Sequence, residues 1–242
     1  MDETGSGPPD LLLTRWDGVY HLVQGERRYG PYHSVEDSSR GLSNAIHYVL
    51  GKRSPMTFLH AGAIEIDGRA VIFPGRSRCG KSTLVASLVG QGCGYLSDEY
   101  AVVTPEGSIL PLSKPIRLRR EGGEAEYVAP SGVSAPGGLP GGMVVLTRYE
   151  PGVVWDPEPV TRGFAILGVL PMALLSRTAP DQVLKAITEL VSGATSYRSG
   201  RGDSEPTMED LLRLQGAADS KAAAGKAEDS QLAGMYGLTR GV

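Results

Sequence analysis

Short runs of alternating apolar and polar residues, separated by turn signals, are the main pattern along this chain. Two pairs of runs flank an Asp-Gly dipeptide: 11–16 with 19–23, and 63–66 with 69–73. Asp-Gly is a favoured two-residue hairpin turn, so each pair predicts two antiparallel strands. Further strands are predicted at 93–96, 101–103, 109–112 and 143–149, and a last strand is expected to close at Tyr197-Arg198.

Helical periodicity alternates with these strands. Apolar residues recur at helical spacing in 35–50, which predicts a helix that Gly51 ends. Segment 83–89 predicts a second helix, closed by Gly90, and segment 180–192 predicts an amphipathic one. The apolar segment 164–167 is expected to help complete the sheet and its cover.

Two stretches lack any such pattern. Residues 121–142 are rich in Gly, Pro and Ser, which predicts a mobile loop, either a lid over a substrate or simple disorder. From residue 200 onward Ser, Gly, Ala, Asp and Lys dominate, so we expect a solvated tail with a turn or more of helix at 208–214. The tripeptide 201–203, Arg-Gly-Asp, is interpreted as a chance occurrence.

Composition narrows the class of protein. With 242 residues, 40% hydrophobic and 21% charged, the chain can form one substantial core. A net charge of -3 gives no reason to expect a nucleic-acid partner. The chain has no apolar stretch of membrane-spanning length and begins with acidic and polar residues, so no membrane association and a cytoplasmic location are predicted. Two cysteines, and histidines 21, 33 and 47 without ligand spacing, indicate neither a disulfide framework nor a zinc site.

The strongest chemical signal is the segment 75–82, which fits G-x-x-x-x-G-K-[ST] between the apolar run 70–73 and the predicted helix. Glycines in this motif let backbone N–H groups turn toward phosphates, the lysine reaches the β and γ oxygens, and the serine can hold Mg²⁺. The motif predicts binding of ATP with Mg²⁺. The predicted binding residues are Gly75, Arg76, Ser77, Arg78, Cys79, Gly80, Lys81, Ser82 and Thr83.

Two adjacent acids follow the predicted strand 93–96. Asp98 and Glu99 stand at its end, where one carboxylate can serve a metal ion and the other can take a proton from an acceptor hydroxyl. An isolated acidic pair is more often a solvated turn. The preceding phosphate-loop motif favours the functional interpretation.

A histidine, His60, precedes the second hairpin. With Lys81, Asp98 and Glu99 it completes an order and spacing, across 58–103, that resembles the HPr kinase/phosphorylase family. The resemblance implies an α/β fold of the HPr kinase/PEP carboxykinase-like type, a P-loop kinase domain with a mixed sheet flanked by helices. It also implies that Asp98 is the base toward a seryl hydroxyl, that His60 lies near the transferred phosphate, that Lys81 and Ser82 serve nucleotide and metal, and that Glu99 supports the metal.

The chain departs from that family in three respects. Arg78 stands where the family usually has glycine, and Glu99 replaces the commoner aspartate. Arg76 and Arg78 either add charge near the phosphates or are merely solvated. The Arg-Gly-rich segment and the later basic loop of bacterial HPr kinases are not found. The closer resemblance is to shorter HPr kinase-like proteins, some of which phosphorylate a peptide serine in pathways for modified peptides such as lasso peptides.

The sequence therefore predicts an ATP-dependent kinase whose acceptor is a hydroxyl, with serine of a peptide or small protein as the leading candidate. A free small-molecule hydroxyl is one alternative acceptor, and a nucleotide-binding regulatory protein with slow ATPase activity is an alternative class. Only the family resemblance argues for a homo-oligomer. Lys114 and Arg117 are either nucleotide or substrate binders or a solvated strand edge, and Arg148 and Arg162 are undistinguished from surface arginines.

The predicted organisation has three parts. Residues 1–55 form an N-terminal hairpin and helix that pack on the core, 56–199 form the catalytic domain, and 200–242 form a flexible tail.

Overall fold

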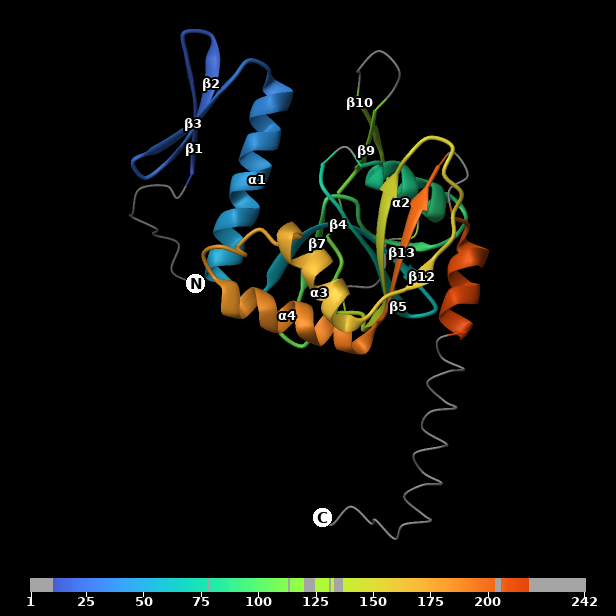
Figure 1. The fold of residues 1–242 in the computed structure, drawn as a ribbon. Helices are drawn as coiled ribbons and strands as arrows, with labels where there is room; N and C mark the ends of the chain where they lie inside the picture. The colour runs from blue at the N-terminus through green and yellow to red at the C-terminus, as the bar shows by residue number, and fades with distance from the viewer. Residues whose placement is uncertain are drawn as a thin grey trace, which may run out of the picture.

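The fold, given by a computed structural model, is built around one mixed β-sheet (Figure 1). The structure describes residues 11–77, 79–112, 114–119, 125–130, 132, 137–202 and 206–217. Eight strands follow the order β12-β13-β11-β5-β4-β7-β8, with β6 paired to β4. Their bounds are β4 Thr57–Ile66, β5 Arg69–Pro74, β6 Gly94–Ser97, β7 Tyr100–Val103, β8 Ile109–Leu110, β11 Gly141–Tyr149, β12 Glu158–Pro159 and β13 Thr195–Arg201.

Helices cover both faces of this sheet. Helix α2 (Lys81–Gly90) packs on one face with a cluster that includes Val71 and Phe73. Helices α3 (Arg162–Val169) and α4 (Pro180–Gly193), joined through the short turn η1 (Leu170–Met172), pack on the other face (Figure 1). Strands β5, β11 and β13 are parallel, whereas β4 runs antiparallel to β5. The predicted α/β fold with a mixed sheet flanked by helices is confirmed.

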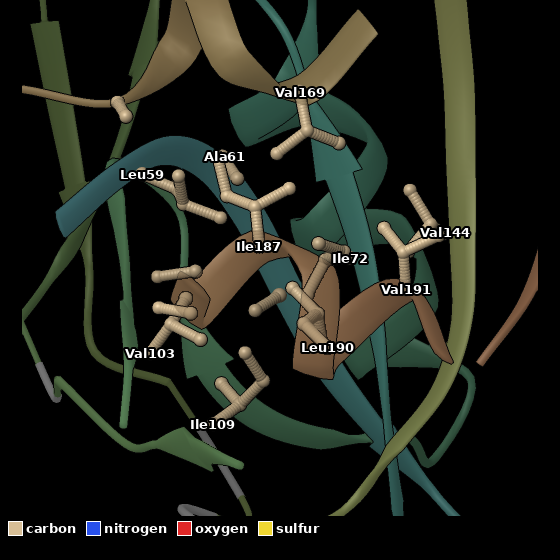
Figure 2. Close-up of a cluster of buried hydrophobic side chains, with 14 of the residues drawn as sticks. Leu59, Ala61, Ile72, Val103, Ile109, Val144, Val169, Ile187, Leu190 and Val191 are labelled. Atoms are coloured by element: carbon tan, nitrogen blue, oxygen red, sulfur yellow. The ribbon is translucent and has the colours of Figure 1, made fainter. Parts of the chain in front are cut away.

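Helix α4 shows how the apolar pattern builds the core. Its buried residues recur every three or four positions, so they form one apolar stripe along the helix. Figure 2 shows Ile187, Leu190 and Val191 of this stripe directed at Ile72 of β5 and Val144 of β11. All five side chains have no exposed surface or nearly none, and truncating one to alanine would cost about 2–5 kcal/mol.

The N-terminal region stands beside the main sheet (Figure 1). The predicted first hairpin is confirmed as β1 (Leu12–Trp16) and β2 (Val19–Gln24), and the structure adds a third strand, β3 (Arg27–Tyr32). Helix α1 (Val35–Arg53) follows, capped by Ser34, whose hydroxyl accepts the N–H of Asp37 at 3.0 Å. The prediction that Gly51 ends this helix is wrong. Gly51 lies inside it and is buried, since its missing side chain allows Leu175 and Phe58 to pack close.

Three other expectations need correction. The stretch 121–142 contains strand β10 (Ala125–Val128), which pairs with β9 (Ile116–Arg119), and it also contains the start of β11. The apolar segment 164–167 is helical, as part of α3. Residues 200–217, expected in the tail, include the end of β13 and a helix at 208–217, as predicted for 208–214. That helix buries Leu211 completely in the α2 side of the core.

None of the helices in the described ranges combines the length and the apolar character needed to cross a membrane.

Candidate functional site

Strand β4 brings the motif residues together. The first half of β4 pairs with β7 and its second half pairs with β6. Asp98 and Glu99 connect β6 to β7, so they lie opposite the middle of β4. The N–H of Ala61 bonds to the carbonyl of Glu99 at 3.2 Å. On the other edge of β4, Ala61 pairs with Pro74, the last residue of β5 before the phosphate-loop motif. The acids and the loop therefore flank the same short stretch of β4, in which His60 lies.

The backbone of the phosphate-loop motif adopts a conformation that depends on glycine. Gly80 has φ +82° and caps the N-terminus of α2, a left-handed conformation that most residues avoid. A Cβ at Gly80 would also collide with the guanidinium of Arg201. At Gly62 of β4 a Cβ would lie 2.7 Å from Val85, so this glycine lets α2 sit directly on the strand. The N–H groups of the first turn of α2 are thus held beside β4, where an anion is favoured.

The Lys81 side chain turns back into the loop. Its ammonium donates to the carbonyls of Gly75 and Arg76 at 2.9 and 2.8 Å, and the side chain is buried. Burial lowers the pKa of Lys81 below its ordinary value, while the thiol of Cys79 and the carboxylates of Asp98 and Glu99 oppose that change. The ammonium therefore lies within the electrostatic reach of both acids.

His60 faces the same ammonium. Its Nδ1 lies 2.6 Å from the carbonyl of Gly75 and 3.3 Å from Nζ of Lys81. A carbonyl only accepts and an ammonium only donates, so the shorter contact assigns the proton to Nδ1 and makes the longer one a contact of two donors. Burial and then the charge of Lys81 lower the pKa of His60, which favours the neutral ring with an unprotonated Nε2.

Asp98 is the buried acid of the pair, with its side chain 7% exposed. Its Oδ1 lies 3.2 Å from the hydroxyl of Tyr95, and its Oδ2 accepts the N–H of Arg117 at 3.4 Å. The same hydroxyl lies 2.9 Å from the carbonyl of Lys114, so one proton is shared between two acceptors. Burial and the charge of Asp98 raise the pKa of Tyr95, which keeps its hydroxyl protonated.

Glu99 is more accessible and is paired. Lys114 lies 3.5 Å from its carboxylate and also donates to Ser43 of α1 at 2.8 Å. Arg117, the other candidate cation, pairs with Glu36 of α1 at 2.6 Å. Both residues therefore connect the acid pair to α1: Lys114 contacts Glu99 with its ammonium, whereas Arg117 contacts Asp98 with its backbone N–H.

Other predicted binders lie at the rim or elsewhere. Arg76, Ser77 and Thr83 are exposed and Ser82 is half-buried, while Arg78 lies outside the described residues. Arg148 at the end of β11 and Arg162 at the start of α3 are exposed, and Arg148 pairs with Glu150 at 3.9 Å. The structure therefore brings His60, Lys81, Asp98 and Glu99 together and leaves these two arginines apart.

Two residues of the site were missed by the sequence analysis. Tyr95 was predicted only as part of a strand, and Arg201 only as part of a chance tripeptide. Arg201 is 1% exposed, and its guanidinium donates to the carbonyl of Cys79 in the loop at 2.9 Å. The strand pattern around Tyr197 was the one available signal, because it brings β13 parallel to β11 near the loop.

The described residues contain no group of three or more His, Cys, Asp or Glu side chains arranged to hold a metal ion.

Fold and loop together define an α/β protein with a phosphate-loop motif, and comparison with known proteins narrows that class. The chain is 30% identical over 101 residues to the HPr kinase/phosphorylases of Bacillus mycoides (strain KBAB4) and Bacillus cereus (strain G9842). The match covers 40% of this chain and 33% of each relative, so the chain spans about a third of their length. Over that part its sequence is HPr kinase-like.

A solved structure is also similar to the chain. The Hpr(Ser) kinase/phosphatase from Coxiella burnetii aligns with a TM-score of 0.31 and 13% sequence identity, over 72% of this chain and 95% of that one. No family model matches the chain.

Proposed function

We propose that the protein is an ATP-dependent kinase that transfers the γ-phosphate to a hydroxyl, with serine of a peptide or small protein as the acceptor. The observation that carries this proposal is the buried carboxylate of Asp98 beside the His60–Lys81 pair, joined to it through β4. A buried acid facing the phosphate loop stands where phosphoryl transfer needs the group that takes the proton of the acceptor hydroxyl.

In this proposal Asp98 is the general base. Its two oxygens already have donors in Tyr95 and the backbone N–H of Arg117, which fix the carboxylate in one orientation. A fixed carboxylate can accept the proton of an acceptor hydroxyl as the oxygen attacks phosphorus in line with the leaving group. The neutral His60 then positions the acceptor or the γ-phosphate through Nε2 or its ring edge.

Lys81 would serve the nucleotide. Its ammonium now satisfies two loop carbonyls, Gly75 and Arg76, and phosphate oxygens are stronger partners because they are charged. We expect the ammonium to exchange these carbonyls for β and γ oxygens, where it stabilises the charge that develops on the leaving group. The N-terminus of α2 holds the remaining phosphate charge.

The oxygen donors of Ser82 and Glu99 fit Mg²⁺, which prefers hydroxyl, carboxylate, phosphate and water oxygens. Bound there with the nucleotide, the ion would neutralise phosphate charge. Glu99 is already paired with Lys114, so this proposal has Lys114 release it or share it when the ion binds.

Serine is proposed from the relatives. The Bacillus relatives are named HPr kinase/phosphorylases, and the match covers a third of their length. The resemblance of residues 58–103 to that family implies a seryl hydroxyl as the acceptor, and we extend this to the chain.

The test is transfer from γ-labelled ATP with Mg²⁺ to a panel of serine-containing peptides, free serine and other hydroxyl metabolites. Asp98→Asn is the test variant, and Asp67→Asn, an exposed residue of the β4–β5 turn, is its matched control. We expect label on a peptide, a loss of about 10³-fold in kcat for Asp98→Asn, and wild-type rates for the control.

Three outcomes contradict parts of this proposal. If label appears only on a free metabolite, the acceptor is a small molecule and not a peptide. If label appears only as free phosphate, the protein is a slow ATPase of regulatory type and not a kinase. If Asp98→Asn keeps full activity, Asp98 is not the general base.

A further inference from the structure

A hollow of about 680 Å³ lies at the ends of β11 and β13, apart from the His60–Lys81–Asp98 cluster. It is lined by Pro74 at the end of β5, by Leu146 and Arg148 of β11, by Phe164 of α3 and by Arg198 of β13. Pro74 immediately precedes Gly75, so the hollow begins where the phosphate-loop motif begins. No step of the proposed phosphate transfer uses it.

The topology of the sheet marks this place as a ligand site. Strands β5 and β11 are adjacent and parallel, and the helices that follow them cover opposite faces, α2 after β5 and α3 after β11 (Figure 1). The two connections therefore diverge at the carboxyl ends of these strands and leave a crevice between them. In open α/β sheets this crevice at a topological switch point is the usual place for a ligand.

The strand order places the acids and the hollow on opposite sides of the phosphate loop. The acids lie on the β4 side of the loop, because β6 and β7 both pair with β4. The hollow lies on the β11 side, across the loop. A nucleotide whose phosphates occupy the loop and whose γ-phosphate faces Asp98 must therefore extend its nucleoside toward β11.

We infer that this hollow binds the nucleoside, base and ribose, of the nucleotide. This inference rests on the proposed function, because it takes the loop as the phosphate site. It assigns the specificity for the base to residues of β11, α3 and β13, none of which belongs to the motif.

The lining has the chemistry that a nucleoside requires. The ring of Phe164 is 47% exposed, and a base can stack on it because every base has a π face. The guanidinium of Arg198 lies 5.8 Å from the centre of that ring and is held by two bonds to Glu158, at 2.7 and 3.0 Å. The guanidinium thus lies over the Phe164 ring, and a base can stack on either of these two groups. Carboxylates at Glu150 and Asp156 can accept hydrogen bonds from ribose hydroxyls, and they disfavour phosphate in the hollow itself.

The experiment compares two ligands by titration calorimetry on the full chain: Mg-ATP, and Mg-tripolyphosphate, which has the phosphates without the nucleoside. Phe164→Ala is the test variant. Leu167→Ala is its matched control, because Leu167 lies on the same helix, is 70% exposed and does not line the hollow. Thermal unfolding of both variants verifies that each is folded.

We expect the wild type to bind ATP more tightly than tripolyphosphate. Phe164→Ala should weaken ATP binding about tenfold and leave tripolyphosphate binding unchanged, since loss of a stacking partner affects only the base. Leu167→Ala should change neither. A second readout is the KM of the acceptor, which Phe164→Ala should leave at the wild-type value.

Each contrary result overturns the inference. Equal affinities of the wild type for ATP and tripolyphosphate would show that the nucleoside contributes nothing, while the loop keeps its phosphate role. An unchanged ratio in Phe164→Ala would place the base elsewhere. A raised acceptor KM with normal ATP binding would make the hollow an acceptor site. Conversely, the expected binding pattern without transfer to any hydroxyl supports the hollow and refutes the kinase proposal.

Discussion

The two flanks of β4 are held in different ways. On the loop flank, the hydrogen bonds described for the His60 and Lys81 side chains join partners at most 21 residues apart in the sequence, and the His60 ring also meets the edge of Tyr100. On the acid flank, three hydrogen bonds among the described residues attach the site to α1, over separations of 56, 71 and 81 residues. These are Tyr100 with Asn44, Lys114 with Ser43, and Arg117 with Glu36. The loop flank is thus a local structure, whereas the acid flank depends on the docking of α1.

This difference suggests that the two flanks have separate roles. Changes on the loop flank should act on nucleotide affinity, and changes on the acid flank should act on turnover or on the attachment of α1. Arg201 is the exception, because it reaches the loop from 122 residues away.

The largest effect is expected from removing the loop ammonium. Lys81→Met should lower kcat/KM about 10³-fold, because it removes a cation from the developing phosphate charge. Lys114→Met should lower kcat less than tenfold and leave ATP affinity intact. Steady-state kinetics and ATP titration separate the two, with the exposed Lys185→Met as control. If both variants lose ATP affinity equally, the two flanks do not have separate roles in nucleotide binding and turnover.

The next effect concerns the attachment of α1. His47 of α1 is buried between the rings of Phe58 and Tyr100, and burial with the charge of Lys114 lowers its pKa from 6.5 to about 4. The unfolded chain therefore binds a proton between pH 6.5 and 4 that the folded chain does not. Stability should fall as the pH drops through this window, by about 3 kcal/mol from this residue.

The measurement is denaturant unfolding from pH 7 to pH 4 for the wild type and for His47→Gln. The variant should lose less stability over that range, because glutamine does not titrate. If the free energy of unfolding depends on pH in the same way in both proteins, protonation of His47 does not contribute to the loss of stability in acid.

A smaller effect is expected at Arg201. Arg201→Met should lower the free energy of unfolding by about 2 kcal/mol, since the buried guanidinium loses its charge-assisted hydrogen bond to the carbonyl of Cys79. It should also raise the KM for ATP with kcat nearly unchanged, because the loop loses its support under Gly80. Arg201→Lys keeps the charge without the planar fork and should recover only part of the affinity. If Arg201→Met is destabilised but keeps the wild-type KM, the residue supports the fold alone.

The smallest effect is expected at the exposed ion pair of Glu36 with Arg117. Glu36→Gln should change the free energy of unfolding by less than about 1 kcal/mol, because surface pairs are screened by solvent. Activity should stay within twofold. Thermal unfolding at low and high salt tests this, and a large loss would mean that this pair, more than Lys114 or His47, attaches α1 to the acid flank.

The loop flank could be predicted from sequence for the same reason that it is local. The Asp67-Gly68 turn, the alternation on each side of it and the spaced glycines of the motif each fix neighbouring backbone. That information suffices for the hairpin of 63–66 with β5 and for α2, which begins at Lys81, whereas residues 57–62 of β4, including His60, were not predicted as strand. The acids were found because they stand at the end of the short apolar strand 93–96, which follows the motif and its helix.

The parts that escaped prediction depend on distant contacts. Gly51 continues α1 because Leu175 and Phe58 pack against it, which the local sequence does not reveal. Strand β10 forms in a Gly-rich stretch because β9 offers it a partner. The hollow at the ends of β11 and β13 forms where the connections after β5 and β11 diverge to opposite faces of the sheet. Its lining residues are therefore far apart in the sequence and form no motif.

The position of Arg201 also limits how the protein can be dissected. A version shortened at residue 199 would retain every motif residue from His60 to Glu99 and would still lose the guanidinium beneath Gly80. It would also lose Leu211 from the α2 side of the core. The smallest portable unit, whether for expression or for grafting the loop into another protein, therefore extends through the helix at 208–217, well past its last recognisable motif.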